Sequence, residues 1–337
     1  RTPQPDSPST VPSIVSSPKV PLLDPIELQD KSASLTPPLF LGIGHTAGTT
    51  LLRLRRRLED QFGDLQRVPS IQTLLLDTDP KDLQAAVFQG GGGFPPNDVL
   101  HLPLKKSSEY RNKSQTSLKW LNRRWLFNIP RSLKTDGLRP LGRLALIDHA
   151  GRVRERMHAA IATATACESI QGSQEVTGMP LENRAMRIVL VSSIAGGSGG
   201  GMVLDLGYLA QQLLSEMGID ETNVTGILIH STDRTQRSQE LSAVNAYSTL
   251  SELNHFGCQR GCYPGDSALR IQRNENNTAF HDTYLVHLGD RLHTPEFEDA
   301  ADRVAAYTDQ DSVTHPTTFF RDYRNAQPST GTPLTRA

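Results

Sequence analysis

A glycine-rich junction between a buried strand and a helix is the feature that most constrains this sequence. The stretch "RIVLVSSIAGGSGGGMVLDLGYLAQQLL" runs from Arg187 to Leu214 and contains "AGGSGGG" from Ala195 to Gly201. Each glycine costs about 0.5–1 kcal/mol of backbone entropy relative to alanine, so the run as a whole lowers the stability of the folded chain. We expect the junction to lie at the surface and to hold a ligand, so that a valine at Gly197 would block the ligand and leave the fold largely intact. A close helix–strand crossing or a plain flexible loop is the alternative.

Strands and helices alternate over the rest of the chain. Short apolar runs such as "PLFLGI", "SIQTLLLD" and "NVTGILIH" predict buried strands, and "TTLLRLRRRLEDQFG" has the apolar spacing of a helix. Continuous apolar strands separated by helices are typical of a parallel sheet that is covered on both faces. We therefore predict an α/β fold, a Rossmann-like parallel sheet with helices on both faces. In such sheets ligands bind at the carboxyl ends of the strands.

Charge and cysteine content exclude several classes of protein. The net charge is -1 and no apolar run approaches the ~20 residues of a membrane span, so nothing indicates a membrane or nucleic-acid partner. The proline-rich start has no signal-peptide pattern. Cys167, Cys258 and Cys262 form no disulfide framework and fit a reducing compartment, so we expect a cytoplasmic protein. His255 lies near two of them, but the spacing matches no standard zinc pattern, and ordinary helix-end residues are the preferred interpretation.

Three polar segments follow predicted strands. "GIGHTAGTT", from Gly42 to Thr50, and "AGGSGGG" each open a helix, and "DTD" ends the second strand. Helix N-termini present free N–H groups and a positive dipole end, and glycine lets the backbone approach an anion closely. These segments predict a site for a phosphate chain. In "DTD", Asp79 before Pro80 is equally suited to cap a helix.

Two known phosphate-binding patterns bear on these segments. Nothing reads G-x-x-x-x-G-K-[ST], which excludes a P-loop NTPase. "GIGHTA" with Asp77 at the end of the next strand satisfies the dinucleotide fingerprint, so an NAD(P)-type enzyme stays open. The dinucleotide pattern leaves "AGGSGGG" unexplained, whereas a site in which two glycine loops face one phosphate chain accounts for both "GIGHTA" and "AGGSGGG".

These motifs together resemble the bacterial tubulin-like family. "AGGSGGGMVLDLGYL" looks like the glycine signature of tubulin and FtsZ, with Ser198 in place of the usual threonine. "LGIGHTAGTT" is similar to the first phosphate loop of FtsZ, and "LLLDTDPKDL" to its N-T-D-x-x-x-L. "TDGLRPLGRLAL", from Thr135 to Leu146, resembles the loop and helix that contact the γ-phosphate. "NAYSTLSEL" and "FEDAADRV" follow in the family order, so the resemblance covers residues 38–310.

The resemblance implies a tubulin/FtsZ-type domain that binds GTP or GDP with Mg²⁺. The first loop would wrap the α- and β-phosphates, the second would cradle the β- and γ-phosphates, the two aspartates of "DTD" would lie near the metal, and a third loop would cap the γ-phosphate. The residues so implied are Gly44, His45, Thr46, Ala47 and Gly48, then Gly196, Gly197, Ser198, Gly199 and Gly200, then Asp77 and Asp79, and finally Gly137, Leu138 and Arg139.

Three features of the sequence depart from the family pattern. Thr49 stands where FtsZ has an asparagine that contacts base and ribose. Asp302 follows Phe297 by five residues where FtsZ has a spacing of four, which leaves guanine and adenine both open. Arg139 stands where asparagine is usual, and it would either neutralise a γ-phosphate or pair with Asp136.

The catalytic acid motif of the family, G-x-x-N-x-D-x-x-D, does not follow the last predicted helix, and no second domain is recognisable. Asp309 and Asp311 are the candidates for that role. We expect a guanine-nucleotide-binding protein, either a GTPase that assembles or switches with nucleotide state or a nucleotide-binding scaffold without hydrolysis. The NAD(P)-type enzyme is the remaining alternative.

Three regions are expected along the chain. Residues 1–36 are rich in proline and serine and predict a disordered linker, and residues 326–337 predict a disordered tail. Residues 37–325 would form the nucleotide-binding domain, with a basic insertion at 105–135 that contains both tryptophans. We expect this insertion to pack on the domain or to contact a partner protein, self-association included, in preference to nucleic acid.

Overall fold

The structure is a computed structural model of the chain. It describes residues 34–89, 92–111, 120–219, 221–232, 236–257, 261–274 and 278–313, together with Thr317 and Phe320. These residues belong to one unit, Ser32–Ala337. The expected tail 326–337 and nearly all of the expected linker 1–36 lie outside the described residues, so the domain boundaries stay predictions.

A six-stranded parallel sheet in the order β3-β2-β1-β4-β5-β6 forms the centre of the fold. Its strands are β1 (Pro38–Ile43), β2 (Gln72–Asp77), β3 (Val99–His101), β4 (Ala185–Ser193), β5 (Glu221–Thr232) and β6 (Asp282–Asp290). Strand order runs outward in both directions from the central pair β1 and β4. In that pair Leu39 lies opposite Ile188 and Ile43 lies opposite Ser192. The predicted Rossmann-like parallel sheet is confirmed.

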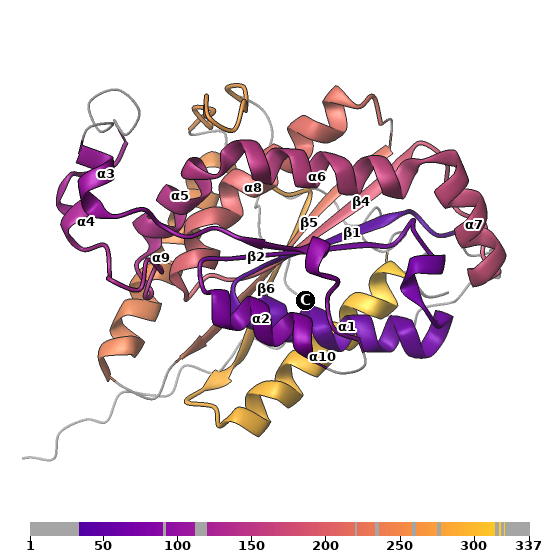
Figure 1. Ribbon diagram of the computed structural model, residues 1–337, viewed down its shortest axis with the longest axis horizontal. Coiled ribbons are helices and arrows are strands. Elements are labelled where there is room, and N and C mark those ends of the chain that lie inside the picture. The colour runs from indigo at the N-terminus through magenta and orange to yellow at the C-terminus, as the bar shows by residue number, and fades with distance from the viewer. Residues whose placement is uncertain are drawn as a thin grey trace, which may run out of the picture. The chain divides into compact units, whose positions relative to one another are not determined.

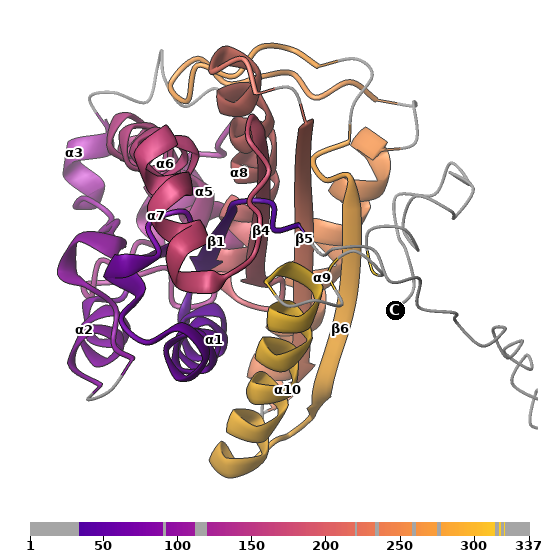
Figure 2. The same cartoon turned by 90° about the vertical axis from the view of Figure 1, so that its right-hand side faces the viewer.

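Helices cover both faces of this sheet (Figures 1 and 2). The core of one face includes residues of α1 (His45–Phe62), α2 (Pro80–Phe88), α7 (Cys167–Thr177) and α10 (Thr294–Ser312). The core of the other includes residues of α5 (Arg139–Asp148), α6 (Ala150–Thr165), α8 (Gly197–Glu216) and α9 (Gln236–Gly257). Short helices α3 (Ser107–Arg111) and α4 (Arg124–Phe127) lie in the expected insertion, and 3₁₀ turns occupy Leu65–Arg67 and Pro96–Asp98. No helix in the described part of the chain is both long and apolar enough to cross a bilayer.

The two cores explain why the central strands read as continuous apolar runs. Successive side chains of a strand point to opposite faces. Leu39 and Leu41 of β1 therefore enter one core while Phe40 enters the other, and all three are fully buried. A central strand with helices on both sides has few solvent-facing positions, so most of its positions select apolar residues, and Arg187 of β4 is an exception that is paired with a carboxylate.

Two segments expected as loops are instead the first turns of helices. α1 begins at His45 and α8 at Gly197, so Gly44 and Gly196 are the residues before each helix. The expectation that the second junction lies at the surface is wrong, because Gly197 and the four residues after it are buried. A Cβ on Gly197 would come within 2.8 Å of Gly137 C and Leu138 N, so a valine there would disturb the fold.

Close packing of helix backbones accounts for part of the glycine run. A Cβ on Gly201 would lie 2.3 Å from the carbonyl oxygen of Arg139, and a Cβ on Gly142 would lie 2.1 Å from that of Gly197. These glycines bring α5 and α8 into backbone contact. At the other side of the first turn, a Cβ on Gly199 would lie 2.2 Å from Ser193 O at the end of β4. The close crossing weighed as an alternative is therefore present alongside any ligand site.

Candidate functional site

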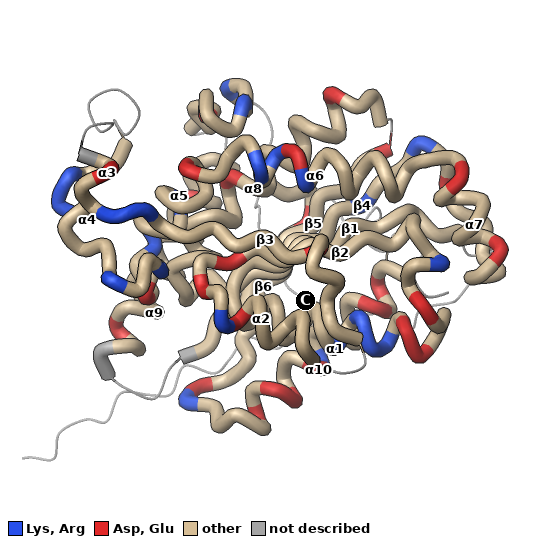
Figure 3. Tube along the Cα trace, viewed as in Figure 1, with Lys and Arg blue, Asp and Glu red and all other residues tan. Residues whose placement is uncertain are grey.

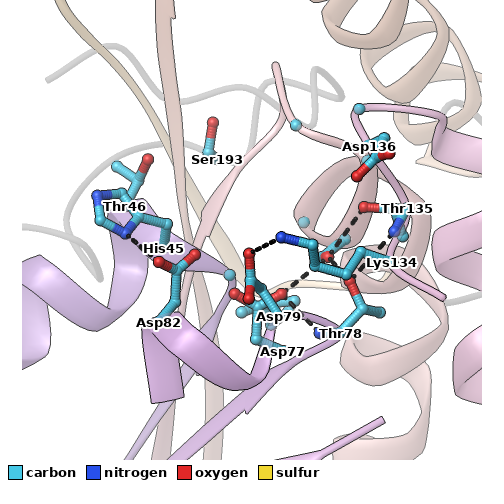
Figure 4. Close-up of a pocket in the computed structure, with 17 residues that line it drawn as sticks. His45, Thr46, Asp77, Thr78, Asp79, Asp82, Lys134, Thr135, Asp136 and Ser193 are labelled. Atoms are coloured by element: carbon cyan, nitrogen blue, oxygen red, sulfur yellow. Dashed lines mark hydrogen bonds and ion pairs between the residues drawn. The ribbon is translucent and has the colours of Figure 1, made fainter. Parts of the chain in front are cut away.

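A cleft of about 230 Å³ opens at the carboxyl ends of β1, β2 and β4 (Figure 4). It lies where the strand order reverses, which is the usual ligand position in open parallel sheets. The residues expected from the sequence that line it are Gly44, His45, Thr46, Asp77, Asp79, Gly137, Gly196, Gly197, Ser198 and Gly199. The three glycine-containing segments and the acidic segment thus meet in one place.

The N-termini of α1 and α8 lie at this cleft without side-chain caps, and α5, also uncapped, begins two residues after Gly137. No side chain caps α1 at Gly44, α5 at Leu138 or α8 at Gly196. Gly44 has φ +84, a conformation that favours glycine, and its built Cβ would lie 3.8 Å from Ser198 Cβ and 4.0 Å from Gly199 N. The first turns of α1 and α8 therefore face each other closely, with N–H groups and positive dipole ends available to an anion.

A buried network of hydroxyl groups joins Asp77 to the start of α8. Ser198 Oγ donates to Asp77 Oδ1 at 3.0 Å and lies 3.1 Å from Thr78 Oγ1 and 3.4 Å from Thr135 Oγ1. The backbone N–H of Thr78 also donates to Asp77 Oδ1, at 2.6 Å. Burial raises the pKa of Asp77, although these two donors oppose the change. The network fixes the side chain of Ser198 in the first turn of α8, where it lines the cleft.

Two further carboxylates at the rim of the cleft, those of Asp79 and Asp82, each interact with a basic side chain (Figure 4). Asp79 caps α2, because its Oδ1 accepts from Lys81 N at 2.9 Å, and its Oδ2 accepts from Lys134 Nζ at 2.6 Å. Burial alone would raise the pKa of Asp79, but the hydrogen bond from Lys134 holds it below the usual value. His45 Nδ1 lies 3.2 Å from Asp82 Oδ1, and this hydrogen bond raises the pKa of the imidazole. Both expected roles of Asp79, as a cap and as a residue of the cleft, coexist.

Three residues expected at the site from "GIGHTAGTT" do not line the cleft, because α1 begins at His45, earlier than expected. Ala47 is fully buried in the core under α1. A Cβ on Gly48 would meet Leu75 at 3.3 Å, so this glycine serves the packing of α1 on β2. Thr49 Oγ1 donates to the carbonyl oxygen of His45, one turn back in the same helix. None of the three lines the cleft.

Arg139 adopts neither of its two expected arrangements. Its guanidinium pairs with Glu252 of α9 and donates to Gly200 O at 2.6 Å and Thr249 Oγ1 at 3.1 Å. Neither a cleft contact nor an ion pair with Asp136 is formed, because the side chain turns to the far side of the first turn of α8. Leu138 and Gly200 accompany it there and do not line the cleft.

The expected base-contacting and catalytic acids also lie outside the cleft. Asp302 pairs with Arg57 of α1 at 2.6 Å. Asp311 pairs with Arg187 at 2.5 Å, and Arg187 lies opposite Pro38 at the amino end of the sheet, far from the cleft edge. Asp309 is also buried, and burial raises its pKa although the charge of Arg57 opposes the change. Two acids held in the core are poorly placed to orient a water molecule.

Several residues of the site were not anticipated. Ile43, Thr78, Asp82, Lys134, Thr135, Asp136 and Ser193 also line the cleft. Asn245 of α9 clamps two of the loops, since its Nδ2 donates to Gly137 O at 2.8 Å and Ala195 O at 3.0 Å. Thr78 lies within "DTD", and Thr135 and Asp136 lie within the segment that resembles the γ-phosphate loop, so these three carried a local signal although they were not named as candidates. Asn245 opens "NAYSTLSEL", which follows the family order, but its two contacts depend on the position of a helix distant in sequence.

The weak zinc pattern has no counterpart in the described residues, which contain no cluster of three or more metal-binding side chains. Cys258 lies outside them. Cys167 and Cys262 are free thiols, and His255 packs beside Phe256.

Comparison with known proteins gives one family. The model of a tubulin-like family matches residues 39–311. No curated protein matches the sequence. The chain is similar in structure to CetZ2 from Haloferax volcanii, a GTPγS-bound protofilament, with 16% identity over 86% of this chain and 63% of that chain and a TM-score of 0.47.

Two TubZ structures are also similar. TubZ of Clostridium botulinum phage c-st has 10% identity over 82% of this chain and 61% of that chain, with a TM-score of 0.41. A GTPγS-form protofilament of TubZ from Bacillus thuringiensis serovar israelensis has 13% identity over 82% and 56%, with a TM-score of 0.45. The chain spans less than two thirds of the length of each of these proteins. Because the family model matches most of the sequence, and the fold and strand-end cleft agree with it, the chain belongs to the tubulin-like family.

Proposed function

We propose that the chain is the nucleotide-binding part of a tubulin-like protein and binds a guanine nucleotide by its phosphates in the strand-end cleft. One observation carries the proposal. The uncapped N-termini of α1 and α8 face each other across the cleft, with Gly44 and Gly196 as the residues before each helix. Paired helix N-termini offer several N–H donors to one phosphate chain, and each charge-assisted hydrogen bond contributes about 1.5–3 kcal/mol.

The cleft also suits a cation that accompanies the phosphates. Asp77 and Asp79 are placed beside the hydroxyl groups of Thr78 and Ser198, and oxygen ligands of this kind are those that Mg²⁺ uses together with phosphate oxygens. Asp77 Oδ1 already accepts two hydrogen bonds and each oxygen of Asp79 accepts one, so both carboxylates would offer the ion's water shell the acceptor capacity that these donors leave. Bound Mg²⁺ would neutralise phosphate charge.

Guanine is proposed from the family and not from a base contact. CetZ2 is described with bound GTPγS, and we extend that nucleotide class to this chain. In the structure, Asp302 is held by Arg57, while His45 and Phe297 are nearly parallel with ring centroids 6.0 Å apart. These two rings are the aromatic groups beside the cleft that a base could contact.

Slow hydrolysis is part of the proposal. Asp309 and Asp311 are buried, so neither of these two candidate acids is exposed to the neighbour of a filament. Groups that bind ground state and transition state equally lower KM without raising kcat. We expect phosphate release below about 1 per minute with excess Mg²⁺, far under ordinary enzyme turnover. A rate above this that rises with protein concentration would show that an acid is supplied between subunits.

Calorimetry with a nucleotide panel tests the binding proposal. GTP, GDP, guanosine, ATP and NAD are titrated into the protein with Mg²⁺. We expect GTP and GDP to bind with micromolar Kd, guanosine to bind at least about tenfold more weakly, and NAD not to bind, because the phosphates make the main contacts. Binding of NAD without binding of GTP or GDP would favour the dinucleotide enzyme instead.

A further inference from the structure

Lys134 lies in the cleft although no glycine pattern or phosphate motif of the sequence points to it. Its Nζ donates to Asp79 Oδ2 at 2.6 Å (Figure 4). Among the cleft-lining residues that the structure describes, it is the only lysine or arginine. It stands one position before Thr135, at the end of the basic insertion. Figure 3 shows Lys and Arg gathered around α4 of the same insertion.

The cleft needs such a cation because its own side chains are mainly acidic. Four aspartates line it, Asp77, Asp79, Asp82 and Asp136. A phosphate chain is anionic, so these carboxylates oppose its entry, and helix dipoles supply only partial positive charge. A lysine carries a full charge on a flexible four-carbon stem with three donors, so it can leave one anion for another.

Asp79 can release Lys134 without losing its structural role. Its two carboxylate oxygens have separate partners, because Oδ1 accepts from Lys81 N and caps α2, whereas Oδ2 accepts from Lys134. If the lysine leaves, the cap of α2 remains. The freed Oδ2 then faces the cleft with no cation of its own.

The backbone around Lys134 is held in an uncommon conformation. Leu133 has φ 57, Asp136 has φ 44 and Gly137 has φ 81, all in the left-handed region. Such a conformation costs a residue other than glycine about 1–2 kcal/mol. Contacts from outside the turn retain it, namely Thr135 N to Thr78 Oγ1 and Asn245 Nδ2 to Gly137 O. Strained turns of this kind cluster at ligand sites, and this one directs Lys134 into the cleft.

We propose that Lys134 is a phosphate ligand that exchanges partners. It pairs with Asp79 in the structure described here, and it moves to an oxygen of the terminal phosphate when a nucleoside triphosphate binds. The exchange leaves the Asp79 carboxylate for the divalent cation that accompanies the phosphates. This inference rests on the proposed function, because it requires the phosphate chain to lie between α1 and α8.

The test compares two lysine variants of the same insertion. Lys134→Met removes the proposed ligand. Lys105→Met is the matched control, because Lys105 also pairs with an aspartate at 2.6 Å, is similarly exposed, and does not line the cleft. Calorimetry with GTP, GDP and inorganic tripolyphosphate measures Kd for each protein, and thermal melting without ligand confirms that each is folded.

For Lys134→Met we expect about tenfold or weaker binding of GTP and of tripolyphosphate, with a smaller loss for GDP, because a charge-assisted hydrogen bond to the terminal phosphate is gone. Lys105→Met should stay within about twofold of the wild type. Unchanged GTP affinity in Lys134→Met overturns the inference. Equal weakening in both variants also overturns it, since that would indicate a general effect of net charge.

A variant of Asp79 tests the exchange itself. Asp79→Asn keeps an oxygen to cap α2 and removes the charge that holds Lys134. Without Mg²⁺ it should bind GTP several-fold more tightly, and the gain should shrink when Lys134→Met is added. A gain of the same size in both backgrounds contradicts the exchange. If the wild type binds no nucleotide, the proposed function and this inference fail together, whereas binding by the wild type with unchanged Lys134→Met affinity removes the inference alone.

Discussion

Replacement of Gly199 by alanine should destabilise the protein even without a ligand. The added Cβ would lie 2.2 Å from Ser193 O and 2.6 Å from Ser192 Oγ, and the carbonyl oxygen belongs to the backbone at the end of β4. The first turn of α8 would have to move by roughly 1 Å to reach ordinary contact distance. Overpacking of this kind costs about 1–3 kcal/mol. For a chain of this size we expect the melting temperature to fall by roughly 2–12 °C.

Gly172→Ala is the matched control. Gly172 lies in the middle of α7, and a Cβ there meets no atom within 4 Å. Alanine in a helix interior is favoured over glycine by about 1 kcal/mol, so this variant should melt about 2–4 °C higher than the wild type. Differential scanning calorimetry of both variants decides the question. If Gly199→Ala is as stable as the wild type while Gly172→Ala gains stability, the glycine run does not serve close packing.

Three further predictions follow from the cleft and the sheet. Gly196→Val should melt within about 0.5 kcal/mol of the wild type, because a Cβ there has only one neighbour, at 3.9 Å, yet calorimetry should show at least about tenfold weaker GTP binding as the side chain enters the cleft. Because the pKa of His45 is raised, its contribution to the unfolding free energy is full below pH 6.5 and is lost as pH rises through the raised pKa. In urea melts from pH 6 to 8.5, the unfolding free energy of the wild type should therefore fall with pH more steeply than that of His45→Gln. Asp311→Asn should lower the unfolding free energy by about 3–5 kcal/mol in urea melts, because it leaves the buried Arg187 without its counter-charge, and a loss under about 1 kcal/mol would contradict this account of the pair.

Apolar patterning was sufficient to predict the sheet and its cover of helices. Side chains of a central strand enter both cores, so the run around Phe40 carried the information locally. The apolar spacing of residues 141–170 predicts one long helix or a helix pair, whereas the structure has three helices there, with breaks at His149 and Ala166. Neither break contains proline or glycine at the junction residue, so the sequence offered no clear sign of it.

The site was predictable where a short segment carries its own geometry. Strand ends, glycines and helix caps are local signals, and they predicted the glycines before α1 and α8 and the two aspartates at the carboxyl end of β2. Arg139 was expected to face a phosphate or Asp136, but its partner Glu252 lies on α9, more than a hundred positions along the chain. The partner of Asp302, Arg57 of α1, is still more distant in sequence, at 245 positions. Such pairings depend on how helices pack on the sheet, and local spacing does not reveal them.

A crystal structure of the chain with GTPγS and Mg²⁺ tests the central claim most directly. The phosphate chain should lie between the first turns of α1 and α8, with its oxygens within hydrogen-bond distance of backbone N–H groups of His45, Ser198 and Gly199. Thr135 and Gly137 should lie beside the terminal phosphate. Nucleotide density at another place on the protein, or a phosphate chain that contacts neither helix N-terminus, would contradict the assignment of this cleft.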